Sequence, residues 1–171
     1  CDAAYILCRG RVKLTTTTSE GRTMLLRVVD AGYVLGLSAI LSEGVHEVTV
    51  EALEPCQVTV INRRPLMEML QKYGEASVGA ARALAQECCS GFNEVRRLAL
   101  PASPAGRVAR LLLDWTAEKS TPQCTKGVAL PLTHEEIASM TSTSRETVTR
   151  TLSRFRRENL ITFKGVLLTV M

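Results

Sequence analysis

The chain has 171 residues, of which 46% are hydrophobic, and its formal net charge is +4 at pH 7. This length allows one large domain or two small ones, each with a real hydrophobic core. No apolar run is long enough to span a membrane and no signal peptide is recognised, so we expect a cytoplasmic protein without a membrane partner. The six cysteines include no CxxC pair, which disfavours a metal site and predicts reduced thiols.

Residues 1 to about 70 are rich in short segments that are β-branched or alternate between apolar and polar residues, a pattern typical of strands. Arg9-Gly10 lies between the first two segments and predicts a hairpin, and residues 19–22 predict a second turn. Repeated short strands and glycine turns favour a closed β-roll, or jelly roll, as an N-terminal domain at residues 1–73. The strands are expected at residues 5–7, 12–15, 24–29, 45–52 and 57–62, with further turns at Gly32 and Gly36.

A long helix is predicted from about residue 75 to residue 100, because apolar residues recur there at spacings of three and four. This spacing forms a heptad seam. The seam could pack on the chain's own roll, but the charged residues that flank its C-terminal half favour the interface of a parallel two-fold dimer. Residues 74–100 are therefore assigned to a dimerisation helix. The seam consists of Val78, Ala81, Ala85, Cys88, Phe92, Val95 and Ala99.

Two prolines end this helix, and residues 100–104 connect it to the next one. Ser103 is a good N-cap, and Pro104 suits the first position of a helix. A polar loop at residues 119–126 and a short strand at residues 128–130 follow that helix. Its inner face is expected to be core and consists of Val108, Leu111, Leu112 and Trp115.

The segment from Thr133 to Lys164 is the most informative part of the chain, because it predicts two short helices and a β-hairpin. Thr133 is a good N-cap, and Glu136 three residues later completes a capping box. Residues 141–143 interrupt the apolar pattern, and Ser144 then caps a second helix. A short helix that is apolar on one face and rich in arginine on the other fits the major groove of DNA. Its apolar face consists of Val148, Leu152 and Phe155.

The exposed face of this second helix has the chemistry of base recognition. Residues 144–164 contain six basic and two acidic side chains, so the positive excess of the chain is concentrated there. A solvated surface would explain charge alone. Arg145, Glu146 and Arg150, however, occupy positions that face base edges, where Arg makes two hydrogen bonds to guanine and Glu accepts from the cytosine amino group. The side chains expected to contact phosphates are Thr133, His134, Thr143 and Ser144.

Residues 144–150, Ser-Arg-Glu-Thr-Val-Thr-Arg, resemble the recognition-helix signature of the Crp/Fnr family of bacterial transcription factors, named after the cyclic-AMP receptor protein and the fumarate-nitrate regulator. Residues 136–138 and 159–161 fit the family as well, and residues 161–167 would form its wing. One departure is Ser142, where the family often has glycine at the turn. Serine can adopt this turn at modest cost, so the expected fold stands.

The resemblance implies an α+β fold. It would consist of an N-terminal double-stranded β-roll that is jelly-roll-like, a long dimerisation helix, and a C-terminal winged helix-turn-helix at residues 101–171. Compared with the family, the roll is expected to lack an opening helix and one or two strands. The resemblance also implies a homodimeric transcription regulator that contacts RNA polymerase. Its double-stranded DNA site would be a palindrome with GTGA-like half-sites about one helical turn apart.

The roll is cyclic-nucleotide-binding-like, but it is not expected to bind cyclic AMP. The family's cassette uses a Glu for the ribose and an Arg for the phosphate, and an ungapped alignment places Leu37 and Glu47 at these positions. A glutamate repels a phosphate. In the same alignment, the helix positions that contact the adenine of the cyclic nucleotide in the family fall on Phe92 and Asn93. We expect no resident cofactor. Binding of haem through His46, or of another small effector, remains an open alternative. The expected pocket consists of Gly36, Leu37, Ser38, Glu47 and Asn93.

Enzymatic activity is not expected, and no catalytic residue is assigned. A jelly roll can form a metal-dependent enzyme, but this requires two or three converging histidines. The chain has only His46 and His134, and the second lies in the DNA-binding segment. The alternative to a transcription regulator is a small-molecule-sensing dimerisation module without DNA-binding activity. A gel shift on a GTGA palindrome would distinguish the two.

Overall fold

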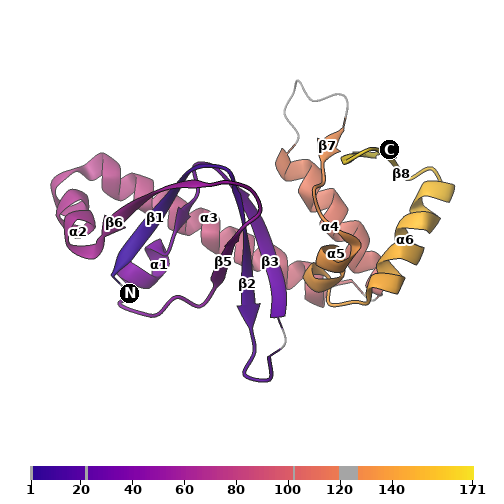
Figure 1. The fold of residues 1–171 in the computed structure, drawn as a ribbon, viewed down its shortest axis with the longest axis horizontal. Coiled ribbons are helices and arrows are strands. Elements are labelled where there is room, and N and C mark those ends of the chain that lie inside the picture. The colour runs from indigo at the N-terminus through magenta and orange to yellow at the C-terminus, as the bar shows by residue number, and fades with distance from the viewer. Residues whose placement is uncertain (1, 22, 102, 120–126) are drawn as a thin grey trace. The chain divides into compact units, whose positions relative to one another are not determined.

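The computed structural model describes residues 2–21, 23–101, 103–119 and 127–171. The chain divides into two compact units, Cys1–Asn93 and Glu94–Met171. The first unit is a β-roll with helices, and the second contains a helix-turn-helix and a small sheet (Figure 1). The α+β class expected from the sequence is therefore confirmed. Among the described residues, no helix combines the length and the apolar character needed to cross a bilayer.

The N-terminal unit contains two antiparallel sheets of three strands each. One sheet has the order β4-β1-β6 and the other has the order β3-β2-β5. The β2 and β3 strands pair up to the predicted second turn, where Thr17 lies opposite Thr23. The six strands are β1 (Ala3–Arg9), β2 (Arg11–Thr17), β3 (Thr23–Asp30), β4 (Val34–Leu35), β5 (Thr49–Ala52) and β6 (Gln57–Asn62).

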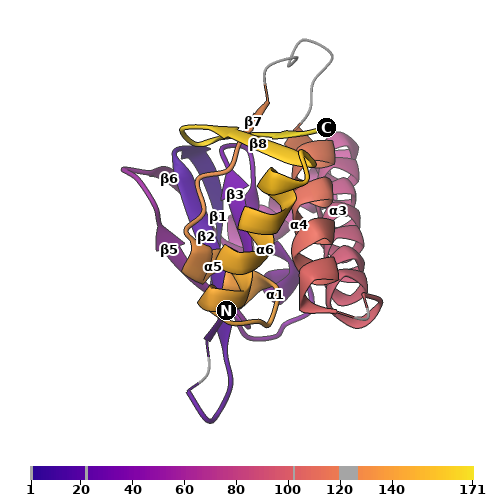
Figure 2. The same cartoon turned by 90° about the vertical axis from the view of Figure 1, so that its right-hand side faces the viewer.

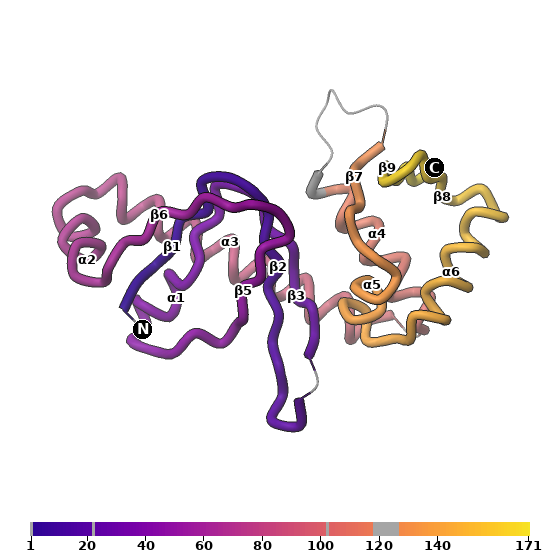
Figure 3. Tube along the Cα trace, in the orientation of Figure 1, coloured from indigo at the N-terminus to yellow at the C-terminus, as the bar shows by residue number. Residues whose placement is uncertain are grey.

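The hairpin predicted at Arg9-Gly10 is wrong. The β1 strand pairs with β4 and β6, whereas β2 pairs with β3 and β5, so the chain passes there from one sheet to the other (Figure 3). Gly10 has φ 91°, a left-handed conformation that glycine adopts without steric cost. A Cβ at this position would lie 2.8 Å from the Pro55 carbonyl oxygen, so glycine also lets the connection between β5 and β6 approach closely. A glycine turn alone cannot distinguish a hairpin from such a crossing.

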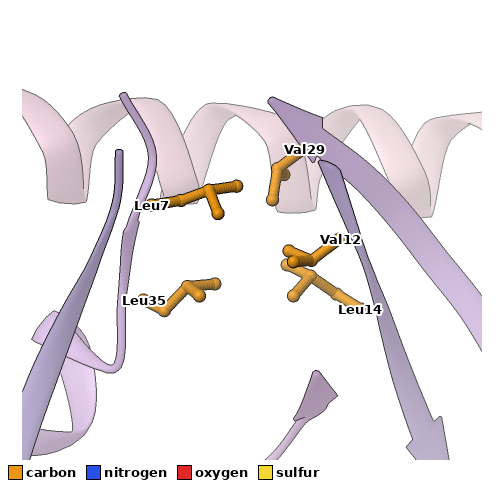
Figure 4. Close-up of a cluster of buried hydrophobic side chains, with 5 residues drawn as sticks. All are labelled: Leu7, Val12, Leu14, Val29 and Leu35. Carbon is orange, nitrogen blue, oxygen red and sulfur yellow. The ribbon is translucent and has the colours of Figure 1, made fainter. Parts of the chain in front are cut away.

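The core of the roll lies between the two sheets. Leu7 of β1 and Leu35 of β4 face three apolar side chains of β2 and β3 (Figure 4). Fully burying side chains of this size contributes about 1.5–3 kcal/mol each. The facing side chains are Val12, Leu14 and Val29.

Three helices complete the N-terminal unit: α1 (Leu37–Leu41), α2 (Arg63–Lys72) and the first part of α3 (Gly74–Ala99). A second cluster joins Ala4 to Leu37 and Ile40 of α1 and Leu66 of α2, with Leu84 of α3 packed against it. Neither α1 nor α2 was predicted, because residues up to about 70 were expected to be β-rich. The strand predicted at residues 45–52 begins only at Thr49. Leu66 is the buried residue of α2.

The C-terminal unit consists of helices and a small antiparallel sheet of order β7-β9-β8, which share one core (Figure 2). Leu111, Ile137, Val148 and Leu168 are almost completely buried in it. The Trp115 indole nitrogen donates a hydrogen bond to the Ala129 carbonyl at 2.9 Å, which joins the first helix to the sheet. The elements are α4 (Pro104–Lys119), β7 (Val128–Ala129), α5 (His134–Met140), α6 (Arg145–Arg157), β8 (Ile161–Lys164) and β9 (Leu167–Val170).

Candidate nucleic-acid interface

The start of α5 is fixed by the predicted capping box. The Glu136 amide donates to the Thr133 hydroxyl oxygen at 3.2 Å, and the Thr133 amide donates to the Glu136 carboxylate at 2.8 Å. Two amides at the start of the helix are thereby satisfied. The helix buries Ile137, Ala138 and Met140 in the core of the unit, so its polar N-terminal end stays at the surface.

The turn between α5 and α6 depends on a residue that the sequence analysis did not identify. Arg107 of α4 donates from Nε to the Thr141 carbonyl at 2.7 Å and from Nη2 to the Ser142 carbonyl at 3.1 Å. Ser142 has φ 47°, so serine does adopt the left-handed turn. Arg107 lies in a helix whose inner face was interpreted as apolar core. No local signal connects it to carbonyls more than thirty residues away.

The second helix, α6, presents the three predicted base-contacting residues to solvent. Ser144 caps it by accepting a hydrogen bond from the Thr147 amide at 3.2 Å. Arg145, Glu146 and Arg150 are exposed, whereas the opposite side of the helix is buried. The core therefore fixes the rotation of α6, and its polar side is available to a partner. The buried side consists of Val148, Thr151, Leu152 and Phe155.

Glu146 is held in its charged form. A hydrogen bond from its own backbone amide, another from the Ser144 hydroxyl and the neighbouring Arg145 cation keep the pKa of Glu146 below its ordinary value. An ionised carboxylate only accepts hydrogen bonds, so this side chain suits a donor such as the cytosine amino group.

The four predicted phosphate-contacting residues gather around the starts of α5 and α6, but part of their bonding capacity is already used. The Thr133 hydroxyl donates to Glu136 at 2.9 Å. The His134 Nδ1 atom lies 2.8 Å from the Thr149 hydroxyl, which itself donates to the Arg145 carbonyl. The imidazole is therefore the donor in this pair, and it links α5 to the exposed side of α6. Ser144 serves as the cap of α6, and Thr143 is half-buried.

The wing is joined to α6 through a cation–π contact. The Arg156 guanidinium lies 4.7 Å from the ring centroid of Phe163 in β8. The β8 and β9 strands form the predicted hairpin, in which Lys164 lies opposite Leu167. This contact holds β8 of the wing against the C-terminal part of α6, the helix that carries the candidate base-contacting residues.

A separate cavity of about 510 Å³ lies in the N-terminal unit. Three residues that the sequence analysis assigned to an effector pocket, Gly36, Ser38 and Glu47, line this cavity. Leu37 does not share that cavity, because it is 4% exposed and belongs to the core cluster with Ile40. Asn93 is exposed on α3 and is not part of the lining.

The same cavity has lining residues that the sequence analysis missed or used only in part. Glu87 of α3 accepts a hydrogen bond from the Ser38 hydroxyl at 3.4 Å. The rings of Tyr5 and His46 lie 6.5 Å apart. Among the described residues that line the cavity there is no Lys or Arg, while Glu47 and Glu87 are both acidic. Glu87 lies some forty residues beyond Glu47 in the chain, so only the folded roll brings them to one cavity.

The predicted seam of α3 is solvent-exposed along its whole length. All seven seam residues, from Val78 to Ala99, are exposed, and Val78, Phe92 and Val95 are 51%, 64% and 63% exposed. The opposite side of the helix packs Ala80, Ala83 and Leu84 against the roll. An apolar stripe therefore runs along the side of α3 that faces away from the chain's own core.

Two family models match the chain. The model of the Crp-like helix-turn-helix domain matches residues 106–170, and the model of the cyclic nucleotide-binding domain matches residues 1–73. The cAMP-activated global transcriptional regulator CRP of Pasteurella multocida is 25% identical over 170 residues, which cover 99% of this chain and 81% of the relative. Its counterpart in Haemophilus influenzae is 26% identical over 167 residues, covering 97% of this chain and 74% of the relative.

Solved structures have the same fold. FixK2 from Bradyrhizobium japonicum matches with a TM-score of 0.81 at 22% identity, over 99% of this chain and 82% of the other. The transcriptional regulator TTHB099 from Thermus thermophilus matches with a TM-score of 0.74 at 28% identity, over 98% and 82%. The family consists of transcription factors, not of enzymes. With a cyclic-nucleotide-binding domain, a long α3 and a Crp-like helix-turn-helix, the chain belongs to the Crp/Fnr family of DNA-binding transcriptional regulators.

Proposed function

We propose that this regulator is a cytoplasmic homodimer that binds a palindrome with GTGA-like half-sites and is not switched by cyclic AMP. The proposal rests on one observation: Arg145, Glu146 and Arg150 are exposed on α6, whereas the opposite side of this helix is buried in the core. In this assignment residues 1–73 form the sensor, residues 74–100 the dimerisation helix and residues 101–171 the DNA-binding domain.

The chemistry of α6 supports base recognition. Each arginine can make two hydrogen bonds to guanine, and the ionised Glu146 can accept from the cytosine amino group. A good two-point contact of this kind discriminates against a wrong base by about 1–3 kcal/mol. The similarity to regulators named CRP suggests half-sites that contain GTGA.

Phosphate contacts would come from the starts of α5 and α6. His134, Thr143 and Ser144 lie there beside helix N-termini, which favour anions. Thr133 would contribute mainly by holding the capping box, because its hydroxyl already donates to Glu136. Such contacts fix the register of the protein on the duplex without selecting a sequence.

The dimer is supported by the exposed stripe of α3. Phe92 and Val95 are each more than 60% exposed in the single chain, although both are large and apolar. Pairing the stripe with its copy would bury both and place two α6 helices about a common two-fold axis, as a palindrome requires. RNA polymerase is proposed as a further partner because the relatives are transcriptional regulators.

The charge of the effector cavity argues against cyclic AMP. Glu47 and Glu87 line it, so a phosphodiester would meet like charge. Leu37 is buried in the core and presents no carboxylate to a ribose hydroxyl. A volume of about 510 Å³ still suits a small molecule, so haem or another effector stays open, and no resident cofactor is proposed.

Fluorescence anisotropy with a labelled GTGA palindrome tests the proposal. The wild-type protein should prefer the palindrome over a scrambled duplex, with no change on adding micromolar cyclic AMP. Arg145→Ala should cost about 1–3 kcal/mol and relax the preference at one guanine. Arg64→Ala, a matched charge loss at an exposed site in α2, should leave that preference intact.

Equal affinity for the palindrome and the scrambled duplex would contradict sequence-specific binding. Absence of binding to either duplex would favour a sensing and dimerisation module without DNA-binding activity. Cyclic-AMP-dependent binding would contradict the effector assignment alone.

A further inference from the structure

The effector cavity of the N-terminal unit carries negative charge that its own lining does not neutralise. Glu47, in the segment before β5, and Glu87, on α3, both line this cavity of about 510 Å³. In the part of the chain that the structure describes, neither carboxylate takes part in an ion pair. The described lining residues include no Lys or Arg. Because like charges repel and an opposite charge stabilises both, a cation in this cavity would be bound favourably.

An arginine does reach the segment that forms one wall of the cavity, but it is bound to a different carboxylate. Arg63, at the start of α2, forms an ion pair with Glu43. Glu43 lies between Ser42 and Gly44 in the chain, and these two neighbours line the cavity whereas Glu43 does not. The pair with Glu43 therefore satisfies Arg63 outside the lining, and the two cavity carboxylates keep their charge.

The remaining walls match an organic cation better than a metal ion. The rings of Tyr5 and His46 lie 6.5 Å apart, and a tyrosine ring attracts a cation through its face. Leu35, Val48 and Val50 add apolar surface to the same lining. Within the described ranges, no three His, Cys, Asp or Glu side chains come together as a metal site. The cavity therefore offers carboxylates for a positive charge and apolar walls for a carbon body.

The polar groups beside Glu87 fit a primary ammonium. The Ser38 hydroxyl donates to the Glu87 carboxylate at 3.4 Å, so the hydroxyl oxygen keeps its lone pairs for an N–H donor. Ser42 brings a second hydroxyl to the lining. An ammonium group has several N–H donors and no acceptor, and it pairs with carboxylate and hydroxyl oxygens through charge-assisted hydrogen bonds.

We propose that the effector cavity takes a small organic cation, whose primary ammonium is held between Glu47 and Glu87 and whose apolar body lies against Tyr5 and Val50. The role of this cation as the effector rests on the proposed function, whereas its binding does not. Glu87 belongs to α3, which also carries the exposed stripe, so the cation would tie the segment before β5 to the proposed dimerisation helix. A ligand that binds one arrangement of α3 more tightly shifts the protein towards that arrangement.

Calorimetry on the full chain tests the charge of the ligand. Three probes of similar shape differ in charge: 2-phenylethylammonium is a cation, 2-phenylethanol is neutral and 3-phenylpropionate is an anion. The ammonium should bind at least about tenfold more tightly than the alcohol, which corresponds to about 1.4 kcal/mol. The anion should not bind, because it would meet Glu47 and Glu87.

A variant without the two charges separates their effect from that of cavity shape. Glu47→Gln/Glu87→Gln keeps the side-chain size, and the new amide oxygen at position 87 can still accept from Ser38. The ammonium should lose its advantage in this variant, while the affinity for 2-phenylethanol stays the same and reports an intact cavity. The matched control Glu68→Gln/Glu75→Gln removes two exposed charges outside the lining and should keep the wild-type preference.

Fluorescence anisotropy with the GTGA palindrome then tests the effector role. Saturating 2-phenylethylammonium should change the affinity of the wild type for the duplex by about fivefold or more, the lower end of ordinary allosteric coupling. The Glu47→Gln/Glu87→Gln variant should show no such change. If no duplex is bound under any condition, the proposed function fails, while the calorimetric result on the cation stands.

Three results would overturn the inference. The ammonium and the alcohol bind the wild type equally. The preference for the ammonium survives in the Glu47→Gln/Glu87→Gln variant. Calcium displaces the ammonium at equal concentration, which would assign the carboxylates to a metal ion. An unchanged duplex affinity at saturating ammonium would refute the effector role alone.

Discussion

Replacing Arg107 by methionine tests how the helix-turn-helix is held together. Methionine keeps much of the aliphatic length of arginine but removes both hydrogen bonds to the turn, at 2.7 Å to the Thr141 carbonyl and 3.1 Å to the Ser142 carbonyl. A hydrogen bond from a charged donor contributes about 1.5–3 kcal/mol net. Thr141 is fully buried, so its carbonyl gains little from water when the guanidinium is gone. Ser142 is exposed, and water can replace the second bond.

The expected loss in the free energy of unfolding of the C-terminal unit is therefore about 2–3 kcal/mol. For a unit of this size, that lowers Tm by roughly 10–20 °C. Circular dichroism during thermal unfolding measures the shift. Arg110→Met is the matched control on the same helix, because Arg110 pairs with Asp114 in a partly exposed ion pair worth less than about 1 kcal/mol. Equal shifts for both variants would refute the role assigned to Arg107.

Ser142→Gly should stabilise the protein by up to about 1 kcal/mol, because relief of the left-handed strain exceeds the entropy that glycine gains in the unfolded chain; a lower Tm would contradict this. If α3 forms the proposed dimer, Phe92→Asp should give a monomer in sedimentation, because it would bury an unpaired charge in the seam. Asn93→Asp, an exposed change off the seam, should leave the proposed dimer intact. Because the pKa of Glu146 is lowered, its carboxylate stays charged as pH falls from about 7 to about 5, and the preference for cytosine at its base pair should stay constant in anisotropy over that range. A preference that fades within that range would show that Glu146 is not the acceptor.

Much of the C-terminal unit could be predicted because its determinants are local. The capping box at Thr133 and Glu136, the cap at Ser144 and the apolar spacing of Val148 and Leu152 each lie within a few residues. The α3 helix was predicted for the same reason, since a long repeat of apolar residues specifies a helix without reference to the rest of the chain.

The parts that could not be predicted depend on contacts distant in sequence. Gly10 connects β1 and β2, which belong to different sheets and pair with strands that come later in the chain. The glycine turn carries no information about that pairing, so the sequence alone suggested a hairpin. Leu37 was placed in the effector pocket by alignment, but its apolar side chain is buried in the cluster that includes Leu66 of α2. Arg107 and Glu87 act on segments about thirty to fifty residues away, and nothing near them in the sequence marks that role.

The boundary between the two compact units falls at Asn93 and Glu94, within α3 and not in a loop. Every backbone torsion at this boundary is helical, and the hydrogen bonds of a helix cross it. The boundary therefore divides one helix, and a protein piece that begins or ends between Asn93 and Glu94 would carry only part of α3. A piece intended to fold alone should start after Ala99, where the helix ends, or carry α3 whole. For the same reason, a substitution near Phe92 that disrupts the helix should perturb both units, because each unit contains part of α3.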